Sequence, residues 1–104
     1  MILTSEQISI IDEKIWINSH KTVVLLDVSR KESISIEEHN ENIFCIDPGK
    51  RIIWKVSAPA SPHGKDSFVA IEFVNGTLRG ERFFGAEYEI DLETGVAKEV
   101  GWHK

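Results

Sequence analysis

Cysteine is almost absent from this chain of 104 residues, and the single Cys45 excludes an internal disulfide. Cys45 lies in the apolar run of residues 43–46, where it is predicted to pack as a small hydrophobic side chain. Long apolar stretches are also missing. No run approaches the roughly 18 residues that cross a membrane, and the first residues lack a secretory signal pattern. These absences predict a cytoplasmic protein that makes no contact with a membrane.

Basic residues are in the minority, with 12 Lys and Arg against 17 Asp and Glu and a formal net charge of -5. An acidic surface repels the phosphates of nucleic acids and of anionic lipids. The composition therefore predicts no nucleic-acid partner and favours a basic protein as the partner.

Helical spacing of apolar residues is nearly absent, whereas short β-branched and aromatic runs recur between Asp, Asn, Gly, Ser and Pro residues. With 41% hydrophobic residues, the chain has enough apolar side chains for one core. We expect a single all-β domain over residues 1–104. Its fold class is an antiparallel meander of about 8–10 short strands, arranged as a two-sheet sandwich or a partly open barrel.

The predicted strands in the first half of the chain differ in how their apolar residues are spaced. Residues 7–11 and 14–18 are predicted to form a hairpin that turns at residues 12 and 13, with Trp16 on the face away from the core. Residues 22–28 are apolar on both faces, which indicates a central, covered strand. Residues 33–37 alternate and are predicted to form an outer strand.

Turn residues divide the rest of the chain. Residues 47–50 read Asp-Pro-Gly-Lys and predict a hairpin in which Gly49 supplies a positive φ. Residues 57–67 contain two prolines and are predicted to be the one long loop, which separates two halves of the chain. Asn75-Gly76 predicts a type I′ hairpin turn, and residues 93–95 predict the last turn.

Two segments, residues 43–56 and 88–96, each have a strand, a turn that contains aspartate and glycine, and a second strand. Both resemble the repeats of PQQ-like β-propellers, with Trp54 where such repeats often carry a tryptophan. The resemblance implies blade-like hairpins. It implies no closed propeller, because 104 residues are too few for four or more blades, and no PQQ site transfers to these positions.

No catalytic apparatus, metal site or cofactor site is predicted. The four histidines, at positions 20, 39, 63 and 103, do not occur at metal-ligand spacing. Ser61, His63 and Asp66 lie close together in the long loop, which allows a nucleophile and a base to be considered. We favour a purely structural role for these three loop residues, because catalytic triads are usually assembled from separate elements. We therefore expect a protein that is not an enzyme.

Two groups of residues are candidates for contact with a partner. The acidic cluster of Glu37, Glu38 and Glu41 is either a solvated turn or part of an acidic docking surface. In the second case, Glu87, Glu89 and Glu93 on a later strand belong to the same surface. Residues 79–85 combine arginines and aromatics, as binding hot spots do, and we expect Arg79, Glu81, Arg82 and Phe84 to contact the partner. The alternative is a β-bulge with Phe83 or Phe84 in the core.

These features favour a non-catalytic protein-binding module. In size, acidity and lack of chemistry it resembles small bacterial immunity proteins, which implies direct neutralisation of a basic, nuclease-type toxin. Two alternatives stay open. One is a small ligand-binding β-barrel or enzyme with a pocket framed by Trp54, His63 and Arg82. The other is an assembly module that pairs through strand edges, and the chain is expected to be a monomer or a homodimer.

Overall fold

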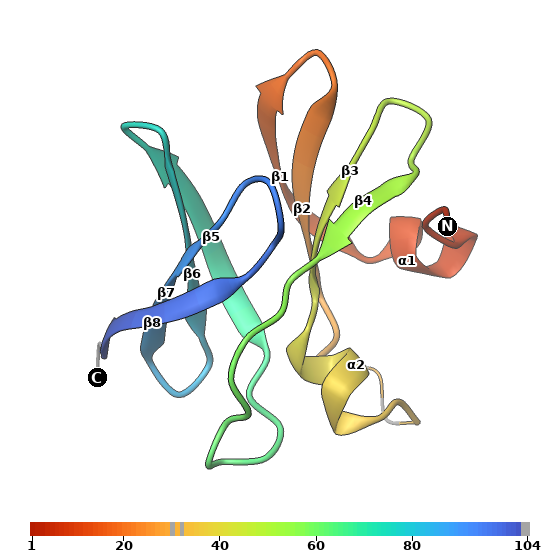
Figure 1. The fold of residues 1–104 in the computed structure, drawn as a ribbon. Coiled ribbons are helices and arrows are strands. Elements are labelled where there is room, and N and C mark those ends of the chain that lie inside the picture. The colour runs from red at the N-terminus through yellow and green to blue at the C-terminus, as the bar shows by residue number, and fades with distance from the viewer. Residues whose placement is uncertain (30, 32, 103–104) are drawn as a thin grey trace.

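The computed structural model describes residues 1–29, 31 and 33–102, which contain two four-stranded antiparallel sheets (Figure 1). The first sheet consists of β1 (Ile11–Asn18), β2 (Lys21–Leu26), β3 (Ile43–Ile46) and β4 (Ile52–Lys55). The second consists of β5 (Phe68–Val74), β6 (Thr77–Arg82), β7 (Ala86–Ile90) and β8 (Ala97–Trp102). In both sheets the strands follow chain order. The predicted all-β two-sheet sandwich is confirmed.

The main core lies between the sheets, because alternate residues of each strand point toward the other sheet. Its buried members are Val23, Leu25, Ile43, Cys45, Trp54 and Val56 from the first half, and Phe68, Ile71, Leu78, Tyr88, Ile90 and Ala97 from the second. A smaller cluster covers the opposite face of the first sheet and includes Val24, Leu26 and Phe44. The prediction of a central strand covered on both faces is confirmed by β2, while Trp16 on β1 is 70% exposed.

Two predicted strands are helices. The turn predicted at residues 12 and 13 lies inside the continuous β1, and α1 (Ser5–Ser9) precedes it. A capping box explains the helix: Gln7 N donates to Thr4 Oγ1 at 3.0 Å, and Thr4 N donates to Gln7 Oε1 at 2.8 Å. The predicted strand at residues 33–37 is wrong, because Ser35 caps α2 (Ile36–Asn40) through the N–H of Glu38.

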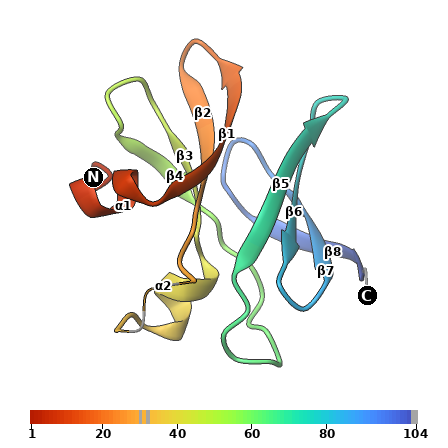
Figure 2. The same ribbon diagram turned by 180° about the vertical axis from the view of Figure 1, so that it is seen from behind.

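α1 lies on the side of the first sheet that faces away from the second sheet, and α2 lies at one end of the first sheet beside the long loop (Figures 1 and 2). Each has five residues. Within the part of the chain that the structure describes, no helix has the length and apolar character needed to span a bilayer.

The predicted turns after β3 are found, with one difference. Asn75 (φ 53°) and Gly76 (φ 78°) both adopt positive φ, as a type I′ turn requires. In the hairpin between β3 and β4, Lys50 (φ 66°) adopts the positive φ that was predicted for Gly49. Lys50 N donates to the Asp47 carbonyl at 2.9 Å, so residues 47–50 close as a turn whose last residue, Lys50, is the left-handed one. Residues 57–67 form the long loop that connects the two sheets.

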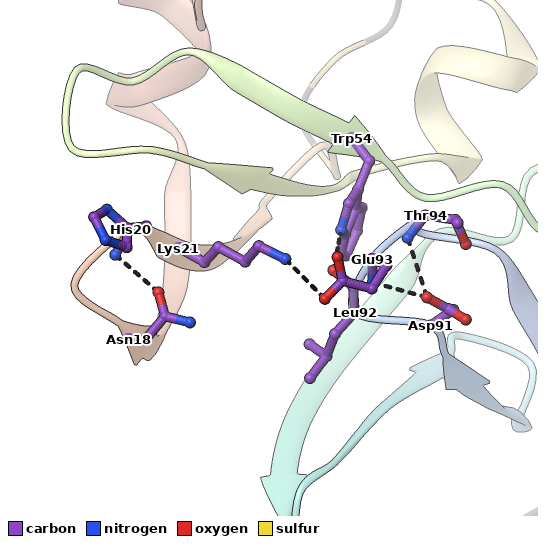
Figure 3. Close-up of polar contacts among 8 residues, drawn as sticks. All are labelled: Asn18, His20, Lys21, Trp54, Asp91, Leu92, Glu93 and Thr94. Atoms are coloured by element: carbon purple, nitrogen blue, oxygen red, sulfur yellow. Dashed lines mark hydrogen bonds and ion pairs between the residues drawn. The ribbon is translucent and has the colours of Figure 1, made fainter.

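The indole of Trp54 joins the two sheets at the turn between β7 and β8 (Figure 3). Its Nε1 donates to the Leu92 carbonyl at 2.8 Å, and its ring lies against Gly95. Gly95 has φ +79°, and a Cβ there would lie 2.5 Å from Trp54 Cε3. The turn also carries Glu93, whose carboxylate pairs with Lys21 of β2 at 3.3 Å. We call these contacts the tryptophan clasp.

Asn42, which is 1% exposed, joins the sheets at the opposite end of β2. Its Nδ2 donates to the carbonyls of Leu26 (2.8 Å) and Phe68 (2.9 Å), and its Oδ1 accepts from Phe68 N (3.0 Å). The side-chain amide thus links the backbones of β2 and β5 by the hydrogen bonds that a peptide group of an intervening strand would make. Because these backbone groups are buried, losing the side chain would leave them without partners.

The substitution Gly95→Ala should destabilise the protein by about 2–4 kcal/mol, because it adds a clash with the indole to the strain of a positive φ. Gly76→Ala is the matched control, since Gly76 has φ +78° and no atom lies within 4 Å of the place that a Cβ would occupy there. The control should lose only about 1 kcal/mol. Urea denaturation followed by fluorescence measures both, and equal losses would show that the indole contact contributes nothing.

The substitution Asn42→Asp should destabilise by about 3–5 kcal/mol, because a buried carboxylate would face two carbonyl oxygens in place of two donated hydrogen bonds. Asn18→Asp is the control. Asn18 is exposed and only accepts a hydrogen bond, from His20 N at 2.8 Å, so its loss should stay within about 0.5 kcal/mol. Thermal unfolding checks the pair, and a stable Asn42→Asp variant would refute the role of this amide.

Candidate binding surface

The outer face of the second sheet is solvent-exposed and acidic. Leu78, Gly80 and Arg82 of β6 point toward the core, so Arg79 and Glu81 point outward. Strand pairing sets Arg79 opposite Glu72 of β5 and opposite Glu89 of β7. The next row sets Glu81 opposite Ala70 and Glu87. Lys98 of β8 lies opposite Glu89, so the face carries four carboxylates against the Arg79 guanidinium and the Lys98 ammonium.

A hollow of about 260 Å³ lies in this face. Its floor contains the small residues Ala70 and Gly80, and its polar wall consists of Glu72, Arg79, Glu81 and Glu87. Gly80 cannot carry a side chain, because a Cβ would lie 2.9 Å from the Phe68 ring on the core side. We call this feature the carboxylate hollow.

The charges around the hollow leave a negative excess. The Arg79 guanidinium pairs with the Glu89 carboxylate at 3.3 Å, an ion pair in which both side chains are partly exposed and which contributes little to stability. Glu81 and Glu87 occupy directly opposite positions on paired strands, where like charges disfavour the folded state.

The ten residues predicted to contact a partner fall into separate places. The structure brings Arg79, Glu81, Glu87 and Glu89 together on the outer face of the second sheet. Glu37, Glu38 and Glu41 lie at α2 beside the first sheet, where Lys55 pairs with Glu41 at 3.0 Å and with Glu37 at 3.9 Å. Glu93 belongs to the tryptophan clasp. The glutamates of α2 and β7 therefore do not form the single acidic surface that was predicted.

Arg82 is not a surface residue, so its predicted contact with a partner is wrong. Its side chain is 2% exposed, with the guanidinium carbon 5.1 Å from the Phe68 ring centre and 5.0 Å from that of Tyr88. Its Nη1 donates to the Pro59 carbonyl at 2.8 Å and to Tyr88 Oη at 2.9 Å. Two aromatic faces and two acceptors stabilise the buried cation, which holds the long loop against the second sheet.

The aromatic residues that follow also differ from the prediction. Phe84 is half-buried, and its ring stacks on the His63 ring with a centroid distance of 4.3 Å. Phe83 is 60% exposed, so the alternative that placed it in the core is wrong. The side chain that enters the core from this segment is Arg82.

The loop residues considered for catalysis have structural contacts. Ser61 Oγ donates to Asp66 Oδ2 at 2.7 Å, and the buried Asp66 also accepts from Phe84 N at 2.9 Å. Asp66 N donates to Asn40 Oδ1 at 2.7 Å, which fixes the end of α2 to the loop. The Ser61 hydroxyl thus donates to a carboxylate rather than to His63, so these residues are not arranged as a nucleophile and its base.

Other reactive groups are buried. Burial raises the pKa of the Cys45 thiol, and nearby Lys21 lowers it by less, so the thiol stays neutral and weakly nucleophilic at neutral pH. Burial likewise raises the pKa of Tyr88. Trp54, His63 and Arg82, which were suggested to frame a pocket, have separate partners: Trp54 donates to the Leu92 carbonyl, His63 stacks on Phe84, and Arg82 packs on Phe68. Among residues 1–29, 31 and 33–102, no group of three or more His, Cys, Asp or Glu side chains is placed to hold a metal ion.

Four residues that line the carboxylate hollow, Ala70, Ile71, Glu72 and Gly80, were not among the predicted contact residues. For Glu72 the signal is present in the sequence. A two-residue turn at Asn75-Gly76 pairs Val74 with Thr77, and counting back along the hairpin sets Glu72 opposite Arg79. The same count sets Ala70 opposite Glu81, and the bulge lies beyond Ala70, where Phe68 rather than Val69 is opposite Arg82.

Comparison with curated proteins and with solved structures found no match. A family model does match, over residues 7–102, which span both sheets from α1 to the end of β8. The chain therefore belongs to the family described as a domain of unknown function (DUF7957).

Proposed function

We propose that this chain is a non-catalytic binding module that recognises a basic protein through the carboxylate hollow. The observation that carries the proposal is the hollow itself: Glu72, Glu81 and Glu87 surround a depression in a rigid, paired sheet. A lysine or arginine side chain from a partner would enter the hollow and pair with the carboxylates of Glu72 and Glu81.

The charge of the whole chain supports the same partner. A formal net charge of -5 attracts a basic protein over distance and raises its association rate, an effect that salt weakens. Sheet residues are also held in fixed positions by the strand ladder, so little conformational entropy is lost when a partner binds.

Within this proposal, the favoured partner is a basic, nuclease-type toxin, and the chain acts as its immunity protein by direct binding. The size and acidity of the chain support this assignment. The single buried Cys45 is compatible with the reducing cytoplasm, where such a partner would be neutralised.

A charge reversal in the hollow tests the proposal. The purified chain serves as bait in extract from its native cells, and the captured partner is identified and produced separately. The partner should be basic, and Glu81→Lys should weaken its binding at least about tenfold in calorimetry. Glu38→Lys, which changes the net charge equally on α2, is the matched control and should weaken binding less than about threefold once salt is near physiological strength.

A larger loss for Glu38→Lys than for Glu81→Lys would refute the carboxylate hollow as the contact site. The immunity assignment has its own test, since the captured partner expressed alone should arrest growth. Co-expression of the wild-type chain should restore growth, and Glu81→Lys should restore it poorly. A captured partner that is harmless would refute the immunity assignment while leaving the binding site intact.

A further inference from the structure

A cavity of about 530 Å³ is lined by residues of both sheets, close to where the edge strands β1 and β5 lie side by side (Figures 1 and 2). The end of β2, α2 and the turn between β6 and β7 also contribute to its walls. Its volume falls within the range of pockets that bind small organic molecules. We call it the edge pocket, and the side chains that matter most for its chemistry are Asp12, His39, Lys65, Val69, Phe83 and Phe84.

Two β-bulges lie at the edge pocket. In its pairing with β2, strand β1 has one extra residue, Asp12, and in its pairing with β6, strand β5 has one extra residue, Val69. Both extra residues line the pocket. Bulges redirect side chains and are common next to binding sites. The backbones of the two neighbouring edge strands are therefore both irregular at this one place.

Aromatic and aliphatic side chains form the apolar wall of the edge pocket. Phe83 is 60% exposed, and its ring centre lies 5.1 Å from that of Phe84 at an interplanar angle of 85°. Val69 is 44% exposed, and the buried Leu25 and Val28 complete the apolar lining. An aromatic ring bound here would remove this surface from water and pack on Phe83.

Asp12 and Lys65 bring opposite charges to the same pocket. Both are exposed, and among the described residues neither has an ion pair. The other carboxylate of the lining, Asp27, accepts from Ser29 N at 3.0 Å and from Ser29 Oγ at 2.6 Å, so it is engaged in the turn after β2. One carboxylate and one ammonium group without ion pairs complement a ligand that carries both charges, rather than a simple cation or anion.

His39 adds a hydrogen-bond acceptor to the edge pocket. Its Nδ1 lies 2.9 Å from Asn40 Oδ1, which also accepts from Asp66 N at 2.7 Å, while Asn40 Nδ2 donates to the Gly64 carbonyl at 2.6 Å. Because the Asn40 oxygen can only accept, Nδ1 of His39 is the donor, and Nε2 of the neutral ring is an acceptor. An ammonium group of a ligand can therefore be held by His39 together with Asp12.

We propose that the edge pocket binds a free aromatic amino acid in its zwitterionic form. The aromatic ring packs on Phe83, the ammonium group pairs with Asp12, and the carboxylate pairs with Lys65. A residue inside a peptide lacks both charges, so the free amino acid is the ligand. The edge pocket shares no lining residue with the carboxylate hollow, so either proposal can fail without the other.

L-Phenylalanine is the probe, and two analogues each lack one of its charges. Phenethylamine has no carboxylate, and 3-phenylpropionate has no ammonium group. In calorimetry, L-phenylalanine should bind at least about fivefold more tightly than either, because a missing charge leaves Lys65 or Asp12 covered without a partner. Glycine, which has both charges and no ring, should bind about tenfold more weakly than L-phenylalanine or less.

Methyl NMR on the unaltered protein locates the ligand. L-Phenylalanine should shift the methyl signals of Leu25, Val28 and Val69. The signals of Val74, at the other end of β5 and outside the edge pocket, should stay unchanged.

Matched variants test the two charges separately. Asp12→Asn should remove the preference for L-phenylalanine over 3-phenylpropionate and keep its preference over phenethylamine, and Lys65→Gln should do the reverse. Glu13→Gln and Lys14→Gln neutralise neighbouring charges of β1 that do not line the pocket, so both preferences should remain.

The aromatic wall is tested by Phe83→Ala, which should weaken the binding of all three aromatic ligands about tenfold. Trp102→Ala is the control, because Trp102 is also largely exposed, at 65%, and lies outside the pocket. Equal affinities for L-phenylalanine and one of the analogues, methyl shifts away from Leu25, Val28 and Val69, or no binding at millimolar concentrations would each overturn the proposal.

Discussion

The docking of the Trp54 indole on the turn between β7 and β8 is the contact on which this fold depends. Each sheet closes its own hydrogen-bond ladder, and among the described residues only the Ser57–Val96 bridge links the two halves as strands do. The sandwich is therefore held by side chains. Trp54 supplies apolar area and one donor at one end, and the Asn42 amide supplies three hydrogen bonds at the other. Gly95 is required because the indole occupies the space of its missing side chain.

The packing of the two sheets determines which of their faces remain available to contact other molecules. The inner faces of both sheets are used in the main core, and each outer face is then free to differ. On the outer face of the first sheet lies the smaller apolar cluster, and the outer face of the second sheet is exposed to solvent and carries the carboxylate hollow. The two outer faces of one small body therefore differ in chemical character.

Much of the architecture could be predicted from the sequence, because strand alternation and turn chemistry are local. Asn75-Gly76 and the long loop were found in this way, and the two-sheet sandwich was one of the two arrangements predicted. The two helices were missed because each has five residues and depends on a cap, at Thr4 and at Ser35, rather than on a long apolar stripe. The burial of Arg82 could not be predicted, because a charged residue enters a core only where distant partners satisfy it, and Pro59 and Tyr88 are brought to it by the fold. The carboxylate hollow could be predicted further than it was: alternation finds its glutamates, and counting back from Asn75-Gly76 sets Glu72 opposite Arg79 and Ala70 opposite Glu81.

Native-state hydrogen exchange tests most directly whether the tryptophan clasp makes the two sheets one cooperative unit. In the wild-type protein, amides of β2 and of β6 should open with the same free energy. Trp54→Phe should lower that free energy by an equal amount in both strands, although Trp54 belongs to only one of the sheets. A loss confined to the first sheet, with β6 amides unchanged, would contradict the account.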